Sequence, residues 1–278
     1  MKAARCNAGF PAGSERDFPV SCRRNVRAAN SVKTLLLILC ATLPALVHAA
    51  LPADPPPSRD TVVLLHGLGG APLWMKRLEW ALEHDGYEVR NISYPSTRHP
   101  VEVLAREHLA PAVERIEVAP GARIHFVTHS LGGLVLRQYL SEIQPKNLGR
   151  VVMLGPPNHG SEVADRLHKN WFYKLVLGPS GQQLGTGTDD FPRRLGSVKF
   201  ELGVIAGNRS RNPFFSPLLP GRDDGMVSVA STQVEGMSDF VVMRSSHNAL
   251  MWRSPVIKQV RAFVTAGQFR HDAVATTN

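Results

Sequence analysis

Short apolar segments alternate with longer amphipathic segments along most of the chain, and this alternation constrains the fold more than any other feature. The predicted strands cover residues 62–65, 87–94, 124–128, 151–154, 202–206 and 240–243, and the predicted helices cover residues 74–83, 101–116, 131–143 and 254–264. Strands that alternate with helices form a parallel sheet with helices on both faces, and functional groups gather at the carboxyl ends of its strands. The sequence therefore predicts an α/β fold with a mostly parallel central sheet, whose functional residues lie in the loops after the strands.

A long segment between two predicted strands interrupts this alternation. Residues 161–197 hold one predicted helix, over residues 161–177, followed by a glycine-rich stretch over residues 181–187. An insertion of this length in a compact domain usually forms a functional cap or a disordered loop, and we expect a cap or lid. Trp171 and Phe172 have two interpretations: they form a buried helix face, or they form the apolar underside of the cap and contact substrate in an acyl-binding cleft.

The net positive charge is concentrated near the N-terminus. Residues 1–49 contain seven of the 32 Lys and Arg residues and two of the 23 Asp and Glu residues, so the formal net charge of +9 falls to +4 over the remainder. A nucleic-acid surface needs a basic excess on the fold itself, so we expect no nucleic-acid partner. Because Cys6, Cys22 and Cys40 all lie in the first 40 residues, the rest of the chain has no Cys nucleophile, thiolate metal site or disulfide framework.

The N-terminal sequence predicts export. An apolar run over residues 35–47 follows the basic stretch and leads to small residues at Ala49 and Ala50, where a signal peptidase would cut. We expect a signal peptide over residues 1–49, a Pro-rich linker over 50–60, one domain over 61–266 with its cap at about 161–197, and a C-terminal tail over 267–278. The alternative is an uncleaved membrane anchor, although the run contains Pro44 and is shorter than the roughly 20 apolar residues of a spanning helix.

The string Thr-His-Ser-Leu-Gly-Gly at residues 128–133 links a predicted strand to a predicted helix. A nucleophilic serine projects from a tight strand-to-helix turn, which needs small residues two positions to either side. Gly132 meets this need, whereas Thr128 stands where glycine is usual. The N–H of Leu131, at the start of the helix, would face a developing oxyanion. The alternative is that Ser130 only caps the helix.

A second glycine-rich turn follows the first predicted strand, in the string His-Gly-Leu-Gly-Gly at residues 66–70. Such a turn can supply the second oxyanion donor of a serine hydrolase, and we expect this donor to be the N–H of Leu68. The string lacks both the Gly-Lys-Ser/Thr ending and the GxGxxG spacing of phosphate-binding loops. Nucleotide binding is therefore poorly supported.

Asp224 and His247 lie in loops near the last two predicted strands. A hydrolase of this architecture carries its nucleophile, acid and base in the chain order Ser, Asp, His. Asp223, which directly precedes Asp224, is the alternative acid. Taken alone, a loop aspartate such as Asp224 or a loop histidine such as His247 would be interpreted as an ordinary turn residue. Their order after the string at residues 128–133 favours nucleophilic catalysis.

These segments together resemble the bacterial lipase and esterase branch of the α/β-hydrolase fold, over residues 61–266. The resemblance rests on four strings: His-Gly at residues 66–67, His-Ser-x-Gly-Gly at 129–133, a Pro-His-x-Gly-Ser-like string at 156–161, and Asp-Gly-x-Val at 224–227. It implies an α/β-hydrolase fold with a central sheet, helices on both faces and a cap insertion.

The resemblance also implies roles for individual residues. Ser130 would be the nucleophile, Asp224 the acid and His247 the base. The N–H groups of Leu68 and Leu131 would form the oxyanion hole. We therefore expect an exported serine hydrolase that cleaves carboxylic esters through an acyl-enzyme intermediate, without a cofactor. Its partners would be a small-molecule or lipid ester and, transiently, a membrane or lipid surface.

Two alternatives to an ester hydrolase stay open. The same triad serves thioesterases and amidases, and a catalytically silent protein of this fold would bind an apolar ligand or a partner instead. No metal site is expected either. Many secreted relatives hold a calcium ion with an Asp shortly after the catalytic His, and this chain has Asn248 and Ala249 at those positions.

Overall fold

The computed structural model describes residues 59–168, 170–210 and 213–271. The predicted signal peptide, almost all of the Pro-rich linker and the last seven residues of the predicted tail lie outside the described residues. Within the described ranges, no helix is long and apolar enough to cross a membrane.

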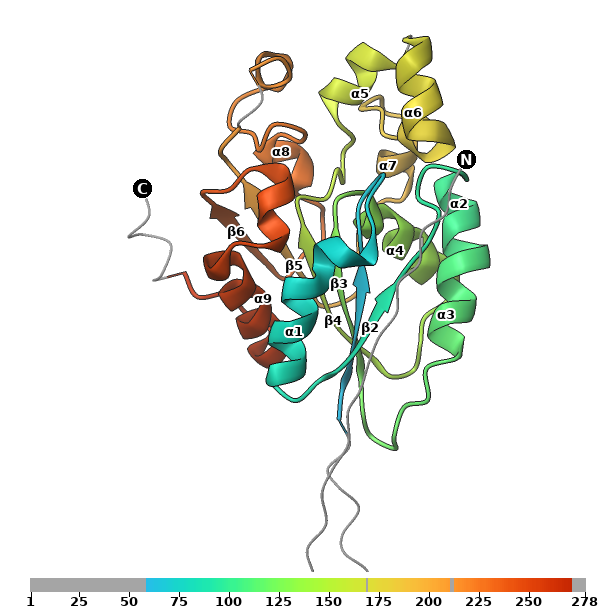
Figure 1. The fold of residues 1–278 in the computed structure, drawn as a ribbon, viewed down its shortest axis with the longest axis vertical. Helices are drawn as coiled ribbons and strands as arrows, with labels where there is room; N and C mark the ends of the chain where they lie inside the picture. The colour runs from blue at the N-terminus through green and yellow to red at the C-terminus, as the bar shows by residue number, and fades with distance from the viewer. Residues whose placement is uncertain (1–58, 169, 211–212, 272–278) are drawn as a thin grey trace, which may run out of the picture. The chain divides into compact units, whose positions relative to one another are not determined.

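Six parallel strands form one sheet in the order β2-β1-β3-β4-β5-β6, which confirms the predicted parallel α/β architecture (Figure 1). The strands are β1 (Thr61–Leu65), β2 (Glu88–Ile92), β3 (Ile124–His129), β4 (Leu148–Leu154), β5 (Leu202–Gly207) and β6 (Asp239–Met243). The chain adds β2 on one side of β1 and all later strands on the other side, so the strand order reverses between β1 and β3. Ligands in such sheets bind where the order reverses, beyond the carboxyl ends of the strands.

Helices cover both faces of the sheet, as predicted. Along β1, Val63 and Leu65 belong to one buried cluster, whereas Val62 and Leu64 belong to the other, because successive side chains of a strand point to opposite faces. The first cluster includes residues of α2 (Val101–Val103), α3 (Ala110–Glu114) and α4 (Leu131–Glu142). The second includes residues of α1 (Lys76–His84) and α9 (Ser254–Ala266), which Figure 1 shows together on the other side.

The helix predicted over residues 101–116 has a wide turn at its centre. A π-helical segment, η2 (Leu104–Leu109), joins α2 to α3, and the N–H of Ala110 donates to the carbonyl of Ala105. Pro111 has no N–H for the usual bond to a carbonyl four residues earlier, so a local departure from α-helical bonding is expected beside it.

The segment between β4 and β5 contains three helices: α5 (Glu162–Leu167), α6 (Trp171–Gln182) and α7 (Phe191–Arg194). The prediction of a single helix over residues 161–177 was therefore wrong, since parts of two helices, α5 and α6, occupy that range. Within α6 the backbone bends at Gly178, which has a φ of 63° and precedes Pro179. Proline disfavours helical backbone in the residue before it, and glycine tolerates the left-handed value.

The remaining short helices lie after the strands or at the ends of longer helices. They are η1 (Pro72–Met75), η3 (Ser216–Leu218), α8 (Val229–Thr232) and η4 (His247–Met251). After α9, Gly267 adopts a left-handed conformation, and Phe269 packs against Phe263 in the core. The first residues of the predicted tail thus belong to the packed domain.

Candidate active site

Ser130 occupies a strained turn between β3 and α4. Its φ of 52° is the one positive value among the non-glycine residues that the structure describes. Such a value is uncommon outside glycine and concentrates at functional sites. The turn fits beside β1 because residue 132 is glycine: a Cβ there would lie 2.8 Å from the carbonyl oxygens of Leu65 and His66. The Ser130 side chain makes no capping bond to α4, so the interpretation of Ser130 as only a helix cap is not supported.

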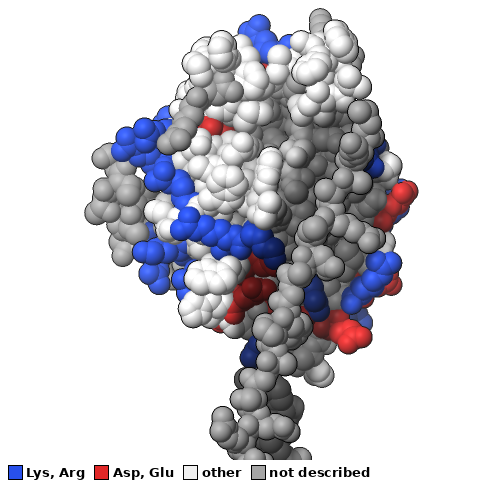
Figure 2. All heavy atoms as spheres, in the orientation of Figure 1, with Lys and Arg blue, Asp and Glu red and all other residues white. Residues whose placement is uncertain are grey.

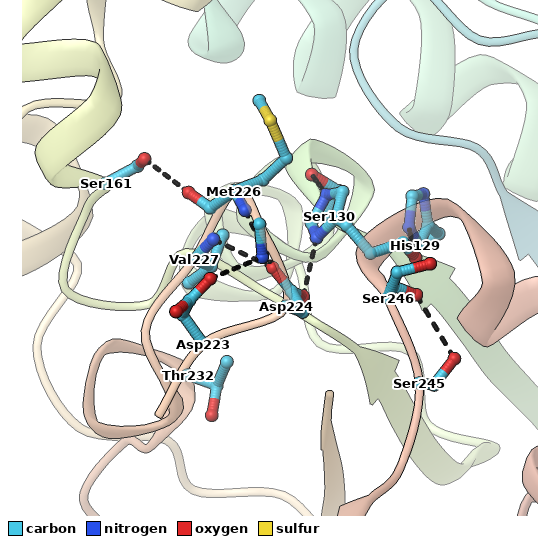
Figure 3. Close-up of polar contacts among 12 residues, drawn as sticks. His129, Ser130, Ser161, Asp223, Asp224, Met226, Val227, Thr232, Ser245 and Ser246 are labelled. Atoms are coloured by element: carbon cyan, nitrogen blue, oxygen red, sulfur yellow. Dashed lines mark hydrogen bonds and ion pairs between the residues drawn. The ribbon is translucent and has the colours of Figure 1, made fainter. Parts of the chain in front are cut away.

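Hydrogen bonds connect Ser130, His247 and Asp224 in series. The Ser130 Oγ lies 2.9 Å from His247 Nε2, and His247 Nδ1 lies 2.8 Å from Asp224 Oδ2. The second carboxylate oxygen of Asp224 accepts the N–H groups of Met226 and Val227, at 3.0 and 2.9 Å (Figure 3). The Asp224 side chain is fully buried, so these bonds hold the carboxylate in one orientation. The structure thus brings together three residues that the sequence separates by more than 110 positions.

Asp223 points away from His247. Its carboxylate accepts the N–H of Gly225 and the hydroxyl of Ser216, each at 2.7 Å. Adjacent residues in extended backbone face opposite sides, so only one of the two aspartates can reach the imidazole. Of the two candidate acids, it is Asp224 that contacts His247.

The glycine-rich turn after β1 lies directly against the Ser130 turn. The N–H of Gly70 donates to the carbonyl of Gly67, and Gly69 has a φ of 64°, as the third residue of a type II turn requires. A Cβ on residue 67 would lie 2.8 Å from His129 Nδ1 and 3.0 Å from Ser130 Cβ, so glycine permits the close approach.

The two predicted oxyanion donors lie next to this contact in the chain: Leu68 belongs to the glycine-rich turn, and Leu131 directly follows Ser130. Within the described residues, the N–H groups of Leu68 and Leu131 donate no hydrogen bond to the protein. Leu131 is the first residue of α4, where N–H groups have no partner inside the helix. Both groups are therefore available to an anionic oxygen next to Ser130.

A mostly apolar cavity of about 220 Å³ opens onto Ser130 and His247. Its apolar walls come from the turn after β1, from the loop after β4 and from the segment between β4 and β5; they include Leu68, Pro157, Val163, Ala164, Leu177 and Leu184. Sequence analysis named Leu68 only as an oxyanion donor and did not identify the other residues as walls of a cavity. For the wall residues between β4 and β5, the signal was the apolar character of parts of residues 161–197. Apolar walls with a few convergent polar groups are typical of small-molecule sites.

Trp171 and Phe172 do not line this cavity. Their exposed fractions are 74% and 59%, so neither belongs to a buried helix face. Both lie at the start of α6, whereas Leu177, one turn and a half further along, supplies the wall. The structure therefore places the aromatic pair on the outer surface of the α5–α6 region.

His129, the residue before Ser130, is buried beside His247. The two rings lie 4.8 Å apart between centroids, and His129 Nε2 donates to the carbonyl of His247 at 3.1 Å. Burial and the neighbouring His247 imidazole hold the pKa of His129 well below its ordinary value of 6.5. His129 therefore packs as a neutral ring and supports the loop that carries His247.

Stability is expected to fall as the solution is acidified below pH 6.5, because unfolding releases the buried His129 into water. The unfolded imidazole takes up a proton below its ordinary pKa of 6.5, whereas the folded one stays neutral, so stability is complete above that pH and decreases below it. Each additional proton that the unfolded state binds lowers the free energy of unfolding by about 1.4 kcal/mol per pH unit of acidification. Thermal unfolding at several pH values should therefore show a shallower acid loss for His129→Asn than for the unchanged protein. Identical slopes would contradict this prediction.

In the described part of the chain, no cluster of three or more His, Cys, Asp or Glu side chains could hold a metal ion.

Comparison with solved structures places this geometry among known folds. The mature form of the lipase BlEst2 from Bacillus licheniformis has a TM-score of 0.58 and 18% identity, over 77% of this chain and 94% of that one. Phospholipase PlaB from Legionella pneumophila has a TM-score of 0.56 and 19% identity, over 78% of this chain and 61% of that one. The metagenomic carboxyl esterase MGS0156 has a TM-score of 0.56 and 17% identity, over 82% and 76%.

At these identities the likeness concerns the fold. The sequence itself matches a family model described as the alpha/beta hydrolase family over residues 62–273, which is most of the chain and all of the sheet except the first residue of β1. The matched range includes the Ser130 turn, Asp224 and His247. With the parallel sheet and the position of the site beyond its carboxyl ends, this match shows that the chain belongs to the alpha/beta hydrolase family.

Proposed function

We propose that this protein is a serine hydrolase that cleaves carboxylic esters through an acyl-enzyme intermediate. The observation that carries the proposal is the hydrogen-bonded series from Ser130 Oγ through His247 to the buried Asp224, next to an apolar cavity. The same arrangement of nucleophile, base and acid recurs on unrelated folds that perform acyl transfer. The likeness to a lipase, a phospholipase and a carboxyl esterase supports this reaction class.

The first half of the reaction forms the acyl-enzyme. His247 Nε2 takes the proton from Ser130 Oγ as this oxygen attacks the ester carbonyl carbon. Asp224 keeps the other ring nitrogen protonated and stabilises the imidazolium that forms. The tetrahedral oxyanion accepts the N–H groups of Leu68 and Leu131, and the intermediate collapses when His247 protonates the departing alcohol oxygen.

The second half releases the acid. His247, now neutral, takes a proton from water as the water oxygen attacks the acyl carbonyl, and the same two N–H groups stabilise the second oxyanion. When this intermediate collapses, His247 returns the proton to Ser130 Oγ. No cofactor takes part in either half.

The apolar cavity favours an ester with an acyl chain or another apolar group. Each methylene that moves from water into such a cavity contributes about 0.8 kcal/mol at most. Thioesters and amides would use the same residues, so they are the alternative substrates. A panel of p-nitrophenyl esters of increasing acyl length, with a thioester and an anilide alongside, tests the class of bond that is cleaved.

A fluorophosphonate probe tests the nucleophile directly. The probe phosphonylates a serine only when a neighbouring base activates it. We expect one adduct per chain, on the peptide that contains Ser130, and none on Ser130→Ala. A protein that binds apolar ligands but neither labels nor turns over any ester would support the catalytically silent alternative.

Export to the periplasm or the medium is part of the proposal. It is supported by the basic stretch, the apolar run and the small residues near Ala49, with an uncleaved anchor as the alternative. Mass analysis of the protein recovered from the cell envelope or the medium separates the two. A product that starts near residue 50 supports cleavage, and a full-length product in the membrane fraction supports the anchor.

The exposed aromatic pair on α6 gives the next prediction. In the upper part of Figure 2, where α5 and α6 lie, most of the described atoms in view belong to uncharged residues. Trp171 and Phe172, at the start of α6, are both exposed. We propose that this pair contacts the part of a long acyl chain that extends out of the cavity past Leu177. The alternative is that the pair contacts a lipid surface.

The double variant Trp171→Ser and Phe172→Ser is expected to keep its melting temperature within about 2 °C, because exposed side chains add little to stability. Its KM for long-chain esters should rise about fivefold or more, whereas its KM for acetate esters should stay within twofold. Measuring both KM values and the melting temperature checks the prediction. A uniform loss on both esters with a lower melting temperature would contradict it.

A further inference from the structure

The oxyanion turn, defined here as residues 67–70, is held by the loop that follows β2. The Gly69 N–H donates to the Ser96 hydroxyl at 2.9 Å. Just before the turn, the carbonyl of His66 accepts the Tyr94 hydroxyl, and the two rings stack 4.3 Å apart. Leu68, the proposed oxyanion donor, lies between these two attachment points.

Both attachments come from buried side chains. Tyr94 and Ser96 are 7% and 4% exposed, so their hydrogen bonds have little competition from water. Burial also raises the pKa of Tyr94, which keeps its hydroxyl protonated and able to donate. The N–H of Ser96 in turn donates to the carbonyl of Tyr94 at 2.9 Å, so the two residues form one short rigid unit.

The far side of this unit is fixed by the segment after β4. The Ser180 hydroxyl, near the end of α6, donates to the carbonyl of Ser96. The side chain of Gln183 accepts the N–H of Val101 and donates to Glu102, both at 2.7 Å. At the bend of α6, a Cβ on Gly178 would overlap the carbonyl of Thr97, so these backbones are in contact. The loop after β2 therefore contacts the segment around the end of α6 on one side and the oxyanion turn on the other.

We propose that Tyr94 and Ser96 are positioning residues that hold the Leu68 N–H in the orientation that stabilises the oxyanion. The inference rests on the proposed function, because an oxyanion forms only if Ser130 attacks a carbonyl. A turn rich in glycine has no side chains with which to hold itself, and oxyanion donors are effective when they are fixed before the reaction begins. Tyr94 and Ser96 supply that rigidity from outside the turn.

The double variant Tyr94→Phe and Ser96→Ala tests the inference, because it removes both hydroxyls and keeps the ring stacked on His66. We expect kcat for p-nitrophenyl acetate to fall about 10-fold to 100-fold with KM within twofold, since misplaced donors weaken binding of the transition state more than that of the ester. The inhibition constant of an alkyl trifluoromethyl ketone, whose adduct carries an oxyanion, should rise by the factor by which kcat/KM falls. Each single variant should lose a smaller part.

The control is Tyr139→Phe with Ser238→Ala, which makes the same two substitutions outside the oxyanion turn and the loop after β2. Tyr139 is a buried tyrosine on α4, and the Ser238 hydroxyl accepts a backbone N–H, from Leu202 at the amino end of β5. This control should keep kcat within twofold. Titration of active sites by the initial p-nitrophenol burst corrects all rates for the fraction of folded enzyme.

The outcomes separate this inference from the proposed function. If the control and the double variant have the same kcat per active site, the inference is overturned and ester hydrolysis by Ser130 still stands. A loss explained entirely by fewer active sites would indicate a structural role and would also overturn it. Should the double variant not fold, Ser96→Ala alone is judged by the same kcat and inhibitor criteria. If the protein without any substitution turns over no ester, both proposals are overturned.

Discussion

Ser130→Ala is expected to reduce kcat for ester hydrolysis by at least about 10⁴-fold while the protein stays folded. The change removes the oxygen that would form the acyl-enzyme, and losing the nucleophile of a triad removes nearly all of its rate enhancement. The backbone should tolerate the change, because serine and alanine both carry a Cβ at the φ of 52° that this turn imposes. Initial rates on p-nitrophenyl acetate and butyrate, with a thermal unfolding curve for each protein, check the prediction.

Ser161→Ala is the matched control for this experiment. Ser161 lines the same cavity, but its hydroxyl donates to the carbonyl of Met226 at 2.6 Å and has no contact with His247 that could activate it. Its loss should change kcat by less than about tenfold, the cost of one neutral hydrogen bond. If Ser130→Ala kept more than a tenth of the original activity, the nucleophile would have to be another residue.

The central strands of the sheet were predictable from sequence because they are short and buried on both faces. Strands β1, β3 and β5 are buried along their whole length, and in β1 and β5 this produces nearly continuous apolar runs. Glycine or proline marks many of the loops between elements. The α5–α6 region was harder to predict, since its helix boundaries depend on the bend at Gly178. That bend is fixed by contact with Thr97, about 80 residues earlier in the chain.

The candidate site was predictable where chain order carried information. Ser130 stands in a recognisable strand-to-helix turn, and an acid and a histidine follow in the expected order. Chain order does not distinguish Asp223 from Asp224, because the two are adjacent in one loop. The hydrogen bonds of the folded protein distinguish them, since Asp224 contacts His247 and Asp223 contacts Ser216. Tyr94 and Ser96 carry no local signal either, since their contacts with the oxyanion turn join residues 27 and 28 positions apart.

Asp224→Asn is expected to lower kcat by about 10⁴-fold without unfolding the protein. The asparagine carbonyl can still accept the N–H groups of Met226 and Val227, which hold the present carboxylate in place. Its NH₂ group would then face His247 Nδ1 and donate to it, so the imidazole proton would move to Nε2. A ring protonated at Nε2 cannot accept the proton of Ser130, and the base is lost although the geometry remains.

Asp223→Asn is the comparison that makes this prediction specific to one carboxylate. Asp223 accepts bonds from Gly225 and Ser216 and has no contact with the imidazole, so its amide should cost about 1 kcal/mol of stability and less than tenfold in kcat. The kcat of both variants is measured on the same ester, together with their melting temperatures. If the large loss appeared in Asp223→Asn instead, Asp223 would be the acid. Equal small losses in both variants would mean that His247 needs no carboxylate to orient it, and that a backbone bond such as His247 N–H to the Asp224 carbonyl, at 2.9 Å, is sufficient.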